Sequence, residues 1–348
     1  MPSIPVGILG ATGMVGQQFI ALLADHPWFK VTYLGASERS AGKAFKDAAA
    51  WRLPNRLPDD VATRVVETAA PGTAPKLVFS GLDSSVAGEI EAAFAKAGHI
   101  VVSNSRNYRM FDTVPLMIPE VNADHLPLLD AQGAAQGWSG RILTNPNCAT
   151  VVLAMALAPL KQFGITSTLI TTLQAISGAG YPGVPSWDIL GNVIPHIGGG
   201  EEEKIETETK KILGTIGAGR IEHHPMRLSA TTTRVPVRDG HTGSISVGLE
   251  QKPTPEAIID AWRSFRGRPQ TLDLPSAPKE PVVYLDEVNR PQPLLDANRE
   301  GGMTVSVGRL RACPLFDYKF VALGHNTIRG AAGAAILNAE LMHAEGRL

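Results

Sequence analysis

Cys148 is the residue of this sequence best suited to covalent chemistry. It stands in residues 145–150 (NPNCAT), directly before the apolar run 151–157. Pro146 prevents a helix from starting earlier and Asn147 is a favourable N-cap, so Cys148 is expected in the first turn of a helix. Free backbone N–H groups and the helix dipole favour negative charge there, and the thiolate is the nucleophilic form of cysteine. The segment predicts an easily ionised thiol, although a buried, inert cysteine fits it too.

Arg234 and His241 stand on either side of a turn signal at residues 239–240 (DG). We expect the flanking strands, 231–237 and 244–249, to fold back there and bring both side chains to one mouth. Histidine is the usual base at neutral pH, and arginine offers a planar fork for a carboxylate. Taken alone, His241 also fits a loop histidine that is hydrogen-bonded to the backbone.

Two further polar segments could complete a site. Gln174 ends an alternating, β-branched strand expected at 167–175, just before residues 177–180 (SGAG). Glycines there would let a flat ligand lie close to the backbone. Glu201 begins an expected exposed helix, 201–213. Acidic residues are ordinary at helix starts, so this acidic run is predicted to be a solvated cap.

Residues 10–16 (GATGMVG) have the spacing G-x-x-G-x-x-G, a variant of the dinucleotide-binding fingerprint. An expected strand, 6–9, precedes them and an expected helix, 14–23, follows. Glycines let the backbone turn tightly and approach a pyrophosphate, which then rests on the helix N-terminus. This context favours a dinucleotide site, and a glycine turn needed only for packing is the alternative.

The loop after the second expected strand indicates which dinucleotide. Arg39 and Lys43 lie there with the hydroxyls of Ser37 and Ser40. Two cations and two hydroxyls suit a 2′-phosphate and favour NADP. Glu38 stands where an acidic residue would bind the ribose hydroxyls of NAD. A solvated surface loop would contain the same residues.

The order of the expected elements indicates an α/β fold with two domains. Short, continuous apolar strands alternate with helices in the first part, which is typical of a Rossmann-type parallel sheet. After Cys148 the strands alternate polar and apolar residues, which predicts an α+β domain with a mixed sheet. We expect the division to fall at residues 1–147 plus 325–348 and at 148–324. The remaining expected elements are strands at 31–34, 77–80, 99–102, 282–285, 304–307 and 319–323, and helices at 84–97 and 328–348.

Composition limits the partners and the compartment. The 348 residues carry 32 basic and 33 acidic side chains, a net charge of −1. This balance gives no support for a nucleic-acid or membrane-surface partner, so we expect small molecules and copies of the chain itself. Cys148 and Cys313 are the only cysteines, which suits a reducing compartment and offers no metal spacing. With no evident secretory signal or membrane-spanning run, a cytoplasmic location is expected.

Taken together, these segments closely resemble aspartate-semialdehyde dehydrogenases of the fungal and archaeal branch. Many matches in one order are far more specific than any single motif. They span nearly the whole chain: GATGMVGQ (10–17), SNSRNYRM (103–110), NPNCAT (145–150), QAISGAGYPGVPS (174–186), GGGEEEK (198–204), RVPVRDGHT (234–242) and HNTIRGAAGAAILNAE (325–340).

The resemblance implies a role for each residue of the site. Cys148 would be the nucleophile, His241 the acid–base catalyst, and Gln174 the residue that orients the acyl intermediate. Arg234 would bind the α-carboxylate of the substrate and Glu201 its ammonium. The phosphate site would comprise Asn147, Arg109 and Lys204. The implied NADP-binding residues are Gly10, Thr12, Gly13, Met14, Val15, Ser37, Arg39, Ser40, Ser177, Gly178 and Asn326.

The reaction implied is the NADPH-dependent reductive dephosphorylation of L-4-aspartyl phosphate to L-aspartate 4-semialdehyde through a cysteine thioester. It belongs to the biosynthesis of lysine, threonine, methionine and isoleucine. The resemblance also implies that the second domain is catalytic and dimerising, in a homotetramer or homodimer. A reductase of another acyl phosphate or of an acyl-CoA would use Cys148 and His241 equally, and a non-catalytic NADP-binding protein is a further alternative. Arg234 together with Glu201 favours an amino-acid substrate.

Overall fold

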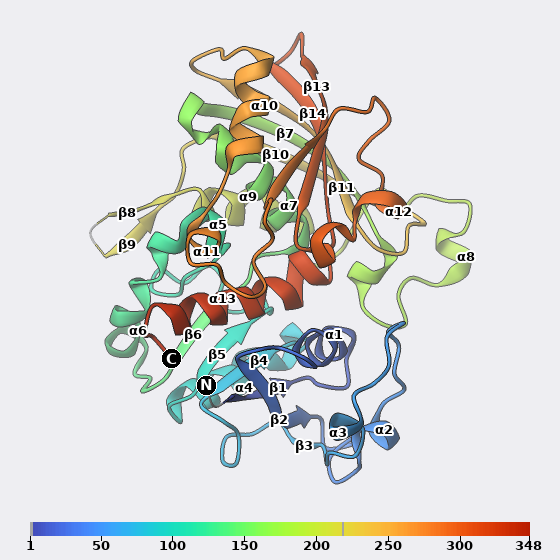
Figure 1. Ribbon diagram of the computed structural model, residues 1–348, viewed down its shortest axis with the longest axis vertical. Coiled ribbons are helices and arrows are strands. Elements are labelled where there is room, and N and C mark those ends of the chain that lie inside the picture. Colours follow the sequence, from blue (N-terminus) through green and yellow to red (C-terminus); the bar gives the residue numbers. More distant parts are fainter. Residues whose placement is uncertain (1–2, 218) are drawn as a thin grey trace.

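The computed structural model describes residues 3–217 and 219–348, which form two six-stranded sheets and an antiparallel pair of short strands (Figure 1). The first sheet has the order β3-β2-β1-β4-β5-β6, and all its neighbours pair in parallel. The predicted Rossmann-type sheet is therefore confirmed, with two strands, β3 and β6, that the sequence reading did not include. The strands are β1 (Ile4–Leu9), β2 (Phe29–Ala36), β3 (Glu67–Thr68), β4 (Leu77–Ser80), β5 (Ile100–Ser103) and β6 (Arg141–Thr144).

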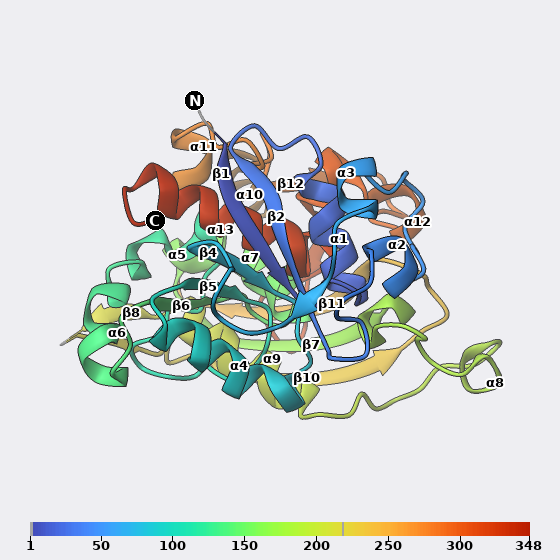
Figure 2. The same ribbon diagram turned by 90° about the horizontal axis from the view of Figure 1, so that it is seen from below.

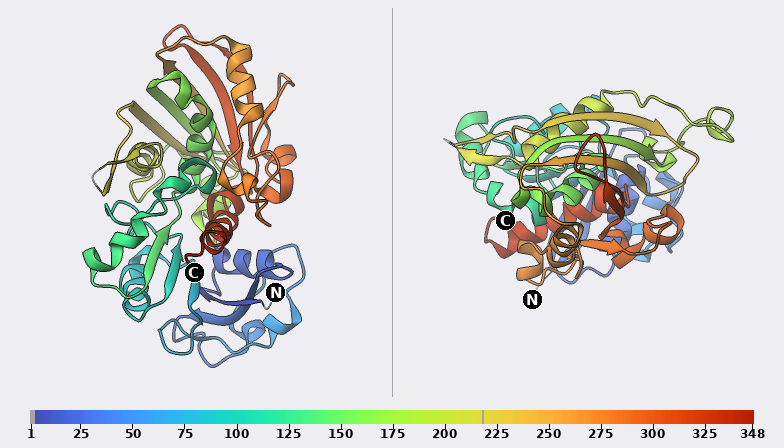
Figure 3. Two further views of the ribbon diagram at one scale, coloured as in Figure 1. Left: turned by 60° about the vertical axis from the view of Figure 1, so that its left-hand side comes forward. Right: turned by 90° about the horizontal axis from the view of Figure 1, so that it is seen from above.

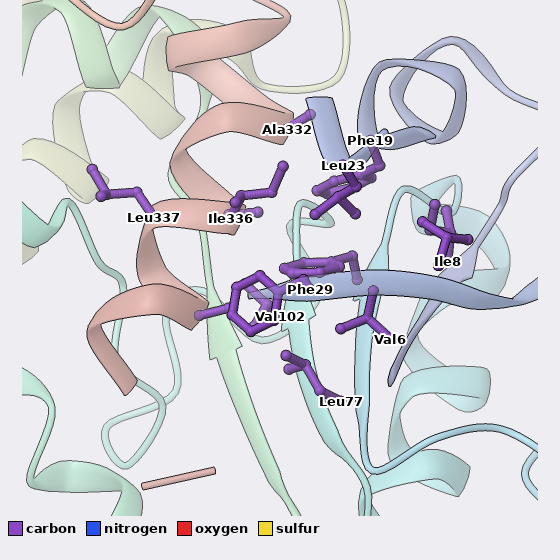
Figure 4. Close-up of a cluster of buried hydrophobic side chains, with 14 of the residues drawn as sticks. Val6, Ile8, Phe19, Leu23, Phe29, Leu77, Val102, Ala332, Ile336 and Leu337 are labelled. Atoms are coloured by element: carbon purple, nitrogen blue, oxygen red, sulfur yellow. The ribbon is translucent and has the colours of Figure 1, made fainter. Parts of the chain in front are cut away.

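Helices cover both faces of this sheet, which is why β4 and β5 are buried along their whole length. Helices α1 (Met14–Leu23) and α13 (Gly333–Ala344) pack on one face, where the Phe19 ring stacks on Phe79. Figure 4 shows this cluster, with Ile336 of α13 beside the strand residues. Helix α4 (Ser84–Lys96) packs on the opposite face through Phe94.

The second sheet is mixed, as predicted, with the order β10-β7-β11-β14-β13-β12. Strand β7 lies between β10, to which it is parallel, and β11, to which it is antiparallel. The predicted hairpin of residues 231–237 and 244–249 is therefore wrong, because β7 is inserted between its two strands. The strands are β7 (Ile165–Gln174), β10 (Arg227–Arg234), β11 (His241–Leu249), β12 (Val282–Leu285), β13 (Val305–Ala312) and β14 (Tyr318–Gly324).

Helix α7 (Cys148–Leu157) is the central helix of the second core, and its residues 149–157 are all buried. It packs against the second sheet together with α9 (Glu201–Ile212) and α10 (Pro255–Ser264). Along β7 the burial alternates, and Leu169 and Leu173 are exposed on the other face of the sheet. One face of this sheet thus forms the core, and the other presents apolar side chains at the surface.

The last segment returns to the first sheet. After β14, a π-helical turn, η5 (Ile328–Ala332), leads into α13. Figure 3 (left) shows this helix end-on between the N-terminal sheet and the rest of the chain. The predicted C-terminal helix is confirmed, and its first turn is wider than an α-helix, a feature that is frequent at functional sites.

The remaining elements are short. Figure 2 shows the loop with α8 projecting from the body of the molecule. The helices are α2 (Phe45–Ala48), α3 (Asp59–Ala62), α5 (Pro119–Asn122), α6 (Leu128–Gln136), α8 (Ser186–Ile189), α11 (Arg268–Thr271) and α12 (Pro293–Asp296), the 3-10 turns are η1 (Ala123–His125), η2 (Ala158–Phe163), η3 (Ile176–Ala179) and η4 (Arg299–Gly302), and the small sheet pairs β8 (Thr215–Gly217) with β9 (Arg220–Glu222).

Candidate active site

Cys148 occupies the first position of α7, as the sequence predicts. The side chain of Asn147 caps this helix, because its Oδ1 accepts from the backbone N–H groups of Ala149 and Thr150 at 2.9 and 3.2 Å. Cys148 as a whole residue is partly exposed and lines a cleft between the two sheets, while its sulfur is enclosed. On its other side lies Gly330 of the π-helical turn, where a Cβ would come within 2.7 Å of the Cys148 Cβ. The close approach of these two segments therefore requires glycine.

His241 meets Cys148 at the start of β11. Its Nε2 lies 3.1 Å from Cys148 Sγ, and the backbone N–H of Ala175 donates to its Nδ1 at 3.1 Å. An Nδ1 that accepts a hydrogen bond carries no proton, so the proton of the neutral ring resides on Nε2 and faces the sulfur. Burial, with the nearby charges of Arg234 and His325, lowers the pKa of His241 to about 3. The ring is therefore neutral throughout the physiological range.

The prediction of an easily ionised thiol is wrong for the chain without ligands. Burial, and after it the charge of Glu201, raise the pKa of Cys148 to about 12, although Arg109 and Arg234 act in the opposite direction. The helix start does favour the thiolate, but removal of water from around the sulfur is the larger effect. A change in the surrounding charges is therefore needed before the thiol ionises.

Gln174 and Arg234 end two neighbouring strands and pair in register across β7 and β10. Arg234 Nη1 donates to the Ala175 carbonyl at 2.7 Å. A Cβ at Gly178 would lie 2.9 Å from Arg234 Nη1 and 3.0 Å from His241 Cε1. Arg234 and His241 thus meet at one mouth as predicted, although the topology that brings them there differs from a hairpin.

The solvated cap predicted at Glu201 is also wrong, and so is the exposed helix. Glu201 is only 7% exposed. Its Oε1 accepts from Asn147 Nδ2 at 2.8 Å and from Gln174 Nε2 at 3.3 Å, and its Oε2 lies 3.2 Å from Lys204 Nζ. Glu201 therefore joins the nucleophile's cap to the end of β7, and α9 turns a charged face inward.

Glu208 and Lys211, which the sequence reading missed, lie on the same face of α9. Glu208 pairs with Arg109 and with the backbone of Asn147, and Lys211 binds three carbonyl groups of residues 109–114. The available signal was the spacing from Glu201, because the residue seven positions along a helix returns to nearly the same face and the residue three positions beyond it is its neighbour there.

A cleft of about 810 Å³ runs from the nucleotide loop to Cys148. The cleft is not lined by Arg39, Ser40, Gln174, Glu201, Lys204, Arg234 or His241. Glu201 contacts Asn147, and His241 contacts Cys148, both of which line it. Tyr181, also unpredicted, receives the Arg52 guanidinium over its ring at 4.1 Å across this cleft. The predicted residues that line the cleft are Gly10, Thr12, Gly13, Met14, Val15, Ser37, Arg109, Asn147, Cys148, Ser177, Gly178 and Asn326.

The nucleotide loop has the geometry that a pyrophosphate requires. Gly10 has a φ of +76°, and a Cβ at Gly16 would lie 2.3 Å from the Gly10 carbonyl oxygen. Gly13 is the N-cap of α1, with no side-chain cap to occupy the first N–H groups. Asn326 joins the opposite wall, because Gly240 N–H donates to its Oδ1 and its Nδ2 donates to Ser177 Oγ, both at 2.8 Å. The loop and its surroundings therefore fit a dinucleotide.

Metal and membrane sites are not indicated. Within residues 3–217 and 219–348, no group of three or more His, Cys, Asp or Glu side chains is arranged to hold a metal ion. In the same part of the chain, no helix combines the length and apolarity needed to cross a bilayer.

Two family models match the chain. The model described as the NAD-binding domain of semialdehyde dehydrogenase matches residues 5–128, and the model of the dimerisation domain of the same family matches residues 157–329. The second match indicates a homo-oligomer. A dinucleotide cleft that ends at a cysteine and a histidine, in a chain matched by both models, defines the class as semialdehyde dehydrogenases.

Similar proteins narrow this class. The aspartate-semialdehyde dehydrogenase of Archaeoglobus fulgidus is 47% identical over 97% of both chains, and that of Cryptococcus neoformans is 49% identical over 99% of this chain and 98% of the relative. The crystal structure of the Candida albicans enzyme with NADP superposes with a TM-score of 0.91 at 45% identity, covering 99% of this chain and 100% of the other. The chain belongs to the aspartate-semialdehyde dehydrogenase family, which confirms the predicted resemblance.

Proposed function

We propose that this chain uses NADPH to reduce L-4-aspartyl phosphate to L-aspartate 4-semialdehyde, with release of phosphate, in the biosynthesis of lysine, threonine, methionine and isoleucine. The observation that carries the proposal is the 3.1 Å contact between Cys148 Sγ and His241 Nε2 at the end of a dinucleotide cleft. Relatives named for this activity match over nearly their whole length. The substrate, the cofactor and the nucleophile are thus part of one proposal.

Cys148 acts as the nucleophile. Its sulfur attacks the acyl carbon, the bond from that carbon to the phosphate oxygen breaks, the departing phosphate takes up the thiol proton, and a thioester remains on the sulfur. NADPH, when bound, supplies the hydride for the thioester carbonyl. His241 holds a proton on Nε2 beside Sγ and stabilises the sulfur as it attacks and as it leaves. Gln174 orients the acyl group from the end of β7. The carbon–sulfur bond then breaks and the aldehyde is released.

Opposite charges select an amino-acid substrate. Arg234 provides a planar fork for the α-carboxylate, and Glu201 provides the anion for the ammonium group. Binding of that ammonium places a cation beside Glu201, whose charge raises the pKa of Cys148 in the free chain. The α-carboxylate and the phosphate place anions beside Arg234 and Arg109, which lower that pKa, so the charges of the substrate act on the thiol in both directions. Arg109, Asn147 and Lys204 bind the phosphate.

The cofactor rests on the open N-terminus of α1. We assign the pyrophosphate to the loop formed by Gly10, Thr12, Gly13, Met14 and Val15. The nicotinamide half lies toward Cys148, where Ser177, Gly178 and Asn326 form the wall. Ser37, Arg39 and Ser40 bind the 2′-phosphate that distinguishes NADP. Arg39 is exposed at the turn after β2, so this assignment requires its side chain to turn toward the cleft.

Three broader assignments accompany the function. We divide the chain into an NADP-binding domain, 1–147 plus 325–348, and a catalytic and dimerisation domain, 148–324. The separate clusters of buried residues beneath the two sheets support this division.

We assign a homodimer or homotetramer, and the exposed apolar face of β7 is suited to such contacts. The free cysteines support a cytoplasmic location.

A phosphate-dependent assay tests the function. We expect aspartate semialdehyde to reduce NADP only when inorganic phosphate is present, and NAD to serve less well. Coenzyme A in place of phosphate is expected to support no reaction. Equal rates with coenzyme A, or no reduction of either cofactor by an enzyme that binds NADP, would overturn the proposal.

A further inference from the structure

A second buried carboxylate, Glu208, lies beside the nucleophile's helix and takes no part in the chemistry proposed above. It is 2% exposed. Its Oε1 accepts from Arg109 Nη1 at 2.9 Å, and its Oε2 accepts from the backbone N–H of Asn147 at 2.6 Å. Both oxygens are therefore engaged in hydrogen bonds, one of them with a cation.

The two partners of Glu208 come from different parts of the fold. Arg109 belongs to the loop that follows β5 of the first sheet, whereas Asn147 is the N-cap that precedes Cys148. A single carboxylate on α9 thus links the guanidinium of Arg109 to the backbone residue directly before the nucleophile. Any displacement of this carboxylate changes the separation between the two groups.

Lys211 fixes the same loop from one turn further along α9. Its Nζ donates to the carbonyl oxygens of Arg109, Phe111 and Val114 at 2.7, 2.7 and 3.0 Å. Lys211 is 1% exposed, so these bonds are shielded from water. Arg109 is therefore held by α9 twice, through its side chain by Glu208 and through its backbone by Lys211.

The guanidinium of Arg109 is held but not saturated. Nη2 donates to the Asn104 carbonyl at 2.6 Å, while the buried Nε has no hydrogen-bond partner among the described residues. Both Arg109 and Asn104 line the cleft that contains Cys148. Nη1 and Nη2 each carry a second N–H, so this oriented cation suits an oxyanion such as phosphate.

We propose that Glu208 is a positioning residue that sets the distance between the phosphate-binding guanidinium of Arg109 and the helix that carries Cys148. The inference rests on the proposed function for the role of Arg109 and adds a residue to it. An acyl phosphate must present its carbon to Sγ and its phosphate to Arg109 at once. A fixed separation between the two groups therefore favours attack, because it orients both ends of the reacting bond.

Glu208→Gln tests the proposal. A glutamine amide has one acceptor oxygen, so its NH2 group faces either Arg109 or the Asn147 N–H and repels that donor. We expect the KM for phosphate to rise on the order of tenfold, with the KM for aspartate semialdehyde changed less than about threefold. Glu203→Gln is the matched control, because Glu203 lies on the same helix, loses the same charge and is exposed. It is expected to leave both constants unchanged.

A second variant covers the case in which Glu208→Gln does not fold. Glu208→Asp keeps the charge and is one methylene shorter, so it should raise the KM for phosphate by a smaller factor. A folded variant of either kind, judged by thermal unfolding, that leaves the KM for phosphate unchanged or raises both KM values equally would overturn the proposal.

Calorimetric binding of inorganic phosphate separates this proposal from the function itself. A wild-type enzyme that binds phosphate but lacks phosphate-dependent turnover contradicts the proposed reaction, and the weaker binding expected for Glu208→Gln still tests the positioning role. A wild-type chain that binds no phosphate contradicts the positioning role directly.

Discussion

Two of the helix N-termini at the cleft, those of α1 and α7, differ in what occupies them. At α1 the N-cap is Gly13, no side chain caps the helix, and the residue is exposed to the cleft. At α7 the N-cap is Asn147, whose Oδ1 already accepts from two of the first N–H groups. The first helix offers its free donors to an external anion, whereas the second has used them within the chain.

This difference shows that a helix start does not by itself ionise a thiol. The dipole of a helix contributes up to about 2 kcal/mol in favourable sites, and the effect is smaller where the donors are satisfied. At Cys148 burial and the charge of Glu201 act against ionisation and are the larger effects, so the pKa rises to about 12. The thiol of Cys148 thus keeps its proton at neutral pH in the chain without ligands, whereas the nucleotide loop has its free donors before anything binds.

The largest expected effect is the loss of turnover in Cys148→Ala. The variant removes the nucleophile and leaves α1 untouched. We expect turnover to fall roughly 10⁴-fold or more, with NADP affinity unchanged. Turnover is measured by NADPH absorbance and affinity by nucleotide fluorescence. Normal turnover in the variant would remove the covalent mechanism.

The complementary change is Gly16→Ala, at the other helix. The added Cβ would lie 2.3 Å from the Gly10 carbonyl oxygen and 2.6 Å from the Ala11 Cα, so the nucleotide loop must move. We expect the Kd for NADP to rise roughly tenfold or more, with little change in the alkylation rate of Cys148. Gly198→Ala is the control, because nothing lies within 4 Å of its added Cβ. An unchanged Kd would mean that the loop does not bind the cofactor.

The features that could be predicted correctly are those that depend on residues close together along the chain. The apolar runs of β4 and β5 and the cap at Asn147 depend on neighbours along the chain, and the structure has them where they were predicted. The glycine spacing around Gly10 belongs to the same category, because a positive φ and a close backbone approach restrict the residue type.

The errors have a common cause, which is contact between distant segments. Helix α9 has the composition of a solvated helix, and only Arg109 and Asn147, far away in sequence, show that Glu208 faces inward. The turn at residues 239–240 contains no sign that β7 will lie between its flanking strands. The pKa of Cys148 likewise depends on the whole enclosure of the sulfur, whereas the sequence shows only the helix start.

Glu201→Gln tests the difference between the two helices, because it removes the charge that opposes ionisation of the Cys148 thiol at α7. Because Glu201 raises the pKa of Cys148, its loss should increase the thiolate fraction at pH 8 and speed alkylation by iodoacetamide roughly three- to tenfold. Turnover should fall, since the proposed ammonium partner is gone. Glu203→Gln, an exposed neighbour on the same helix, should change neither. Slower labelling of Glu201→Gln would show that the carboxylate does not act on the sulfur.

The smallest expected effect is a change of thermal stability with pH that is caused by the thiol of Cys148, at the start of α7. The pKa of Cys148 is raised from an ordinary value of 9.0 to about 12, so between these values the folded chain keeps a proton that the unfolded chain releases. The stabilisation is complete below pH 9 and is lost as pH rises toward 12. Compared with Cys148→Ser, whose hydroxyl does not titrate in this range, the wild-type Tm should therefore fall by a few degrees more between pH 8 and pH 10.5. A Tm difference that stays constant over this range would show that the folded chain does not hold the thiol proton. Gly16→Ala, which changes only α1, should follow the wild-type pH profile, because it alters no titrating group.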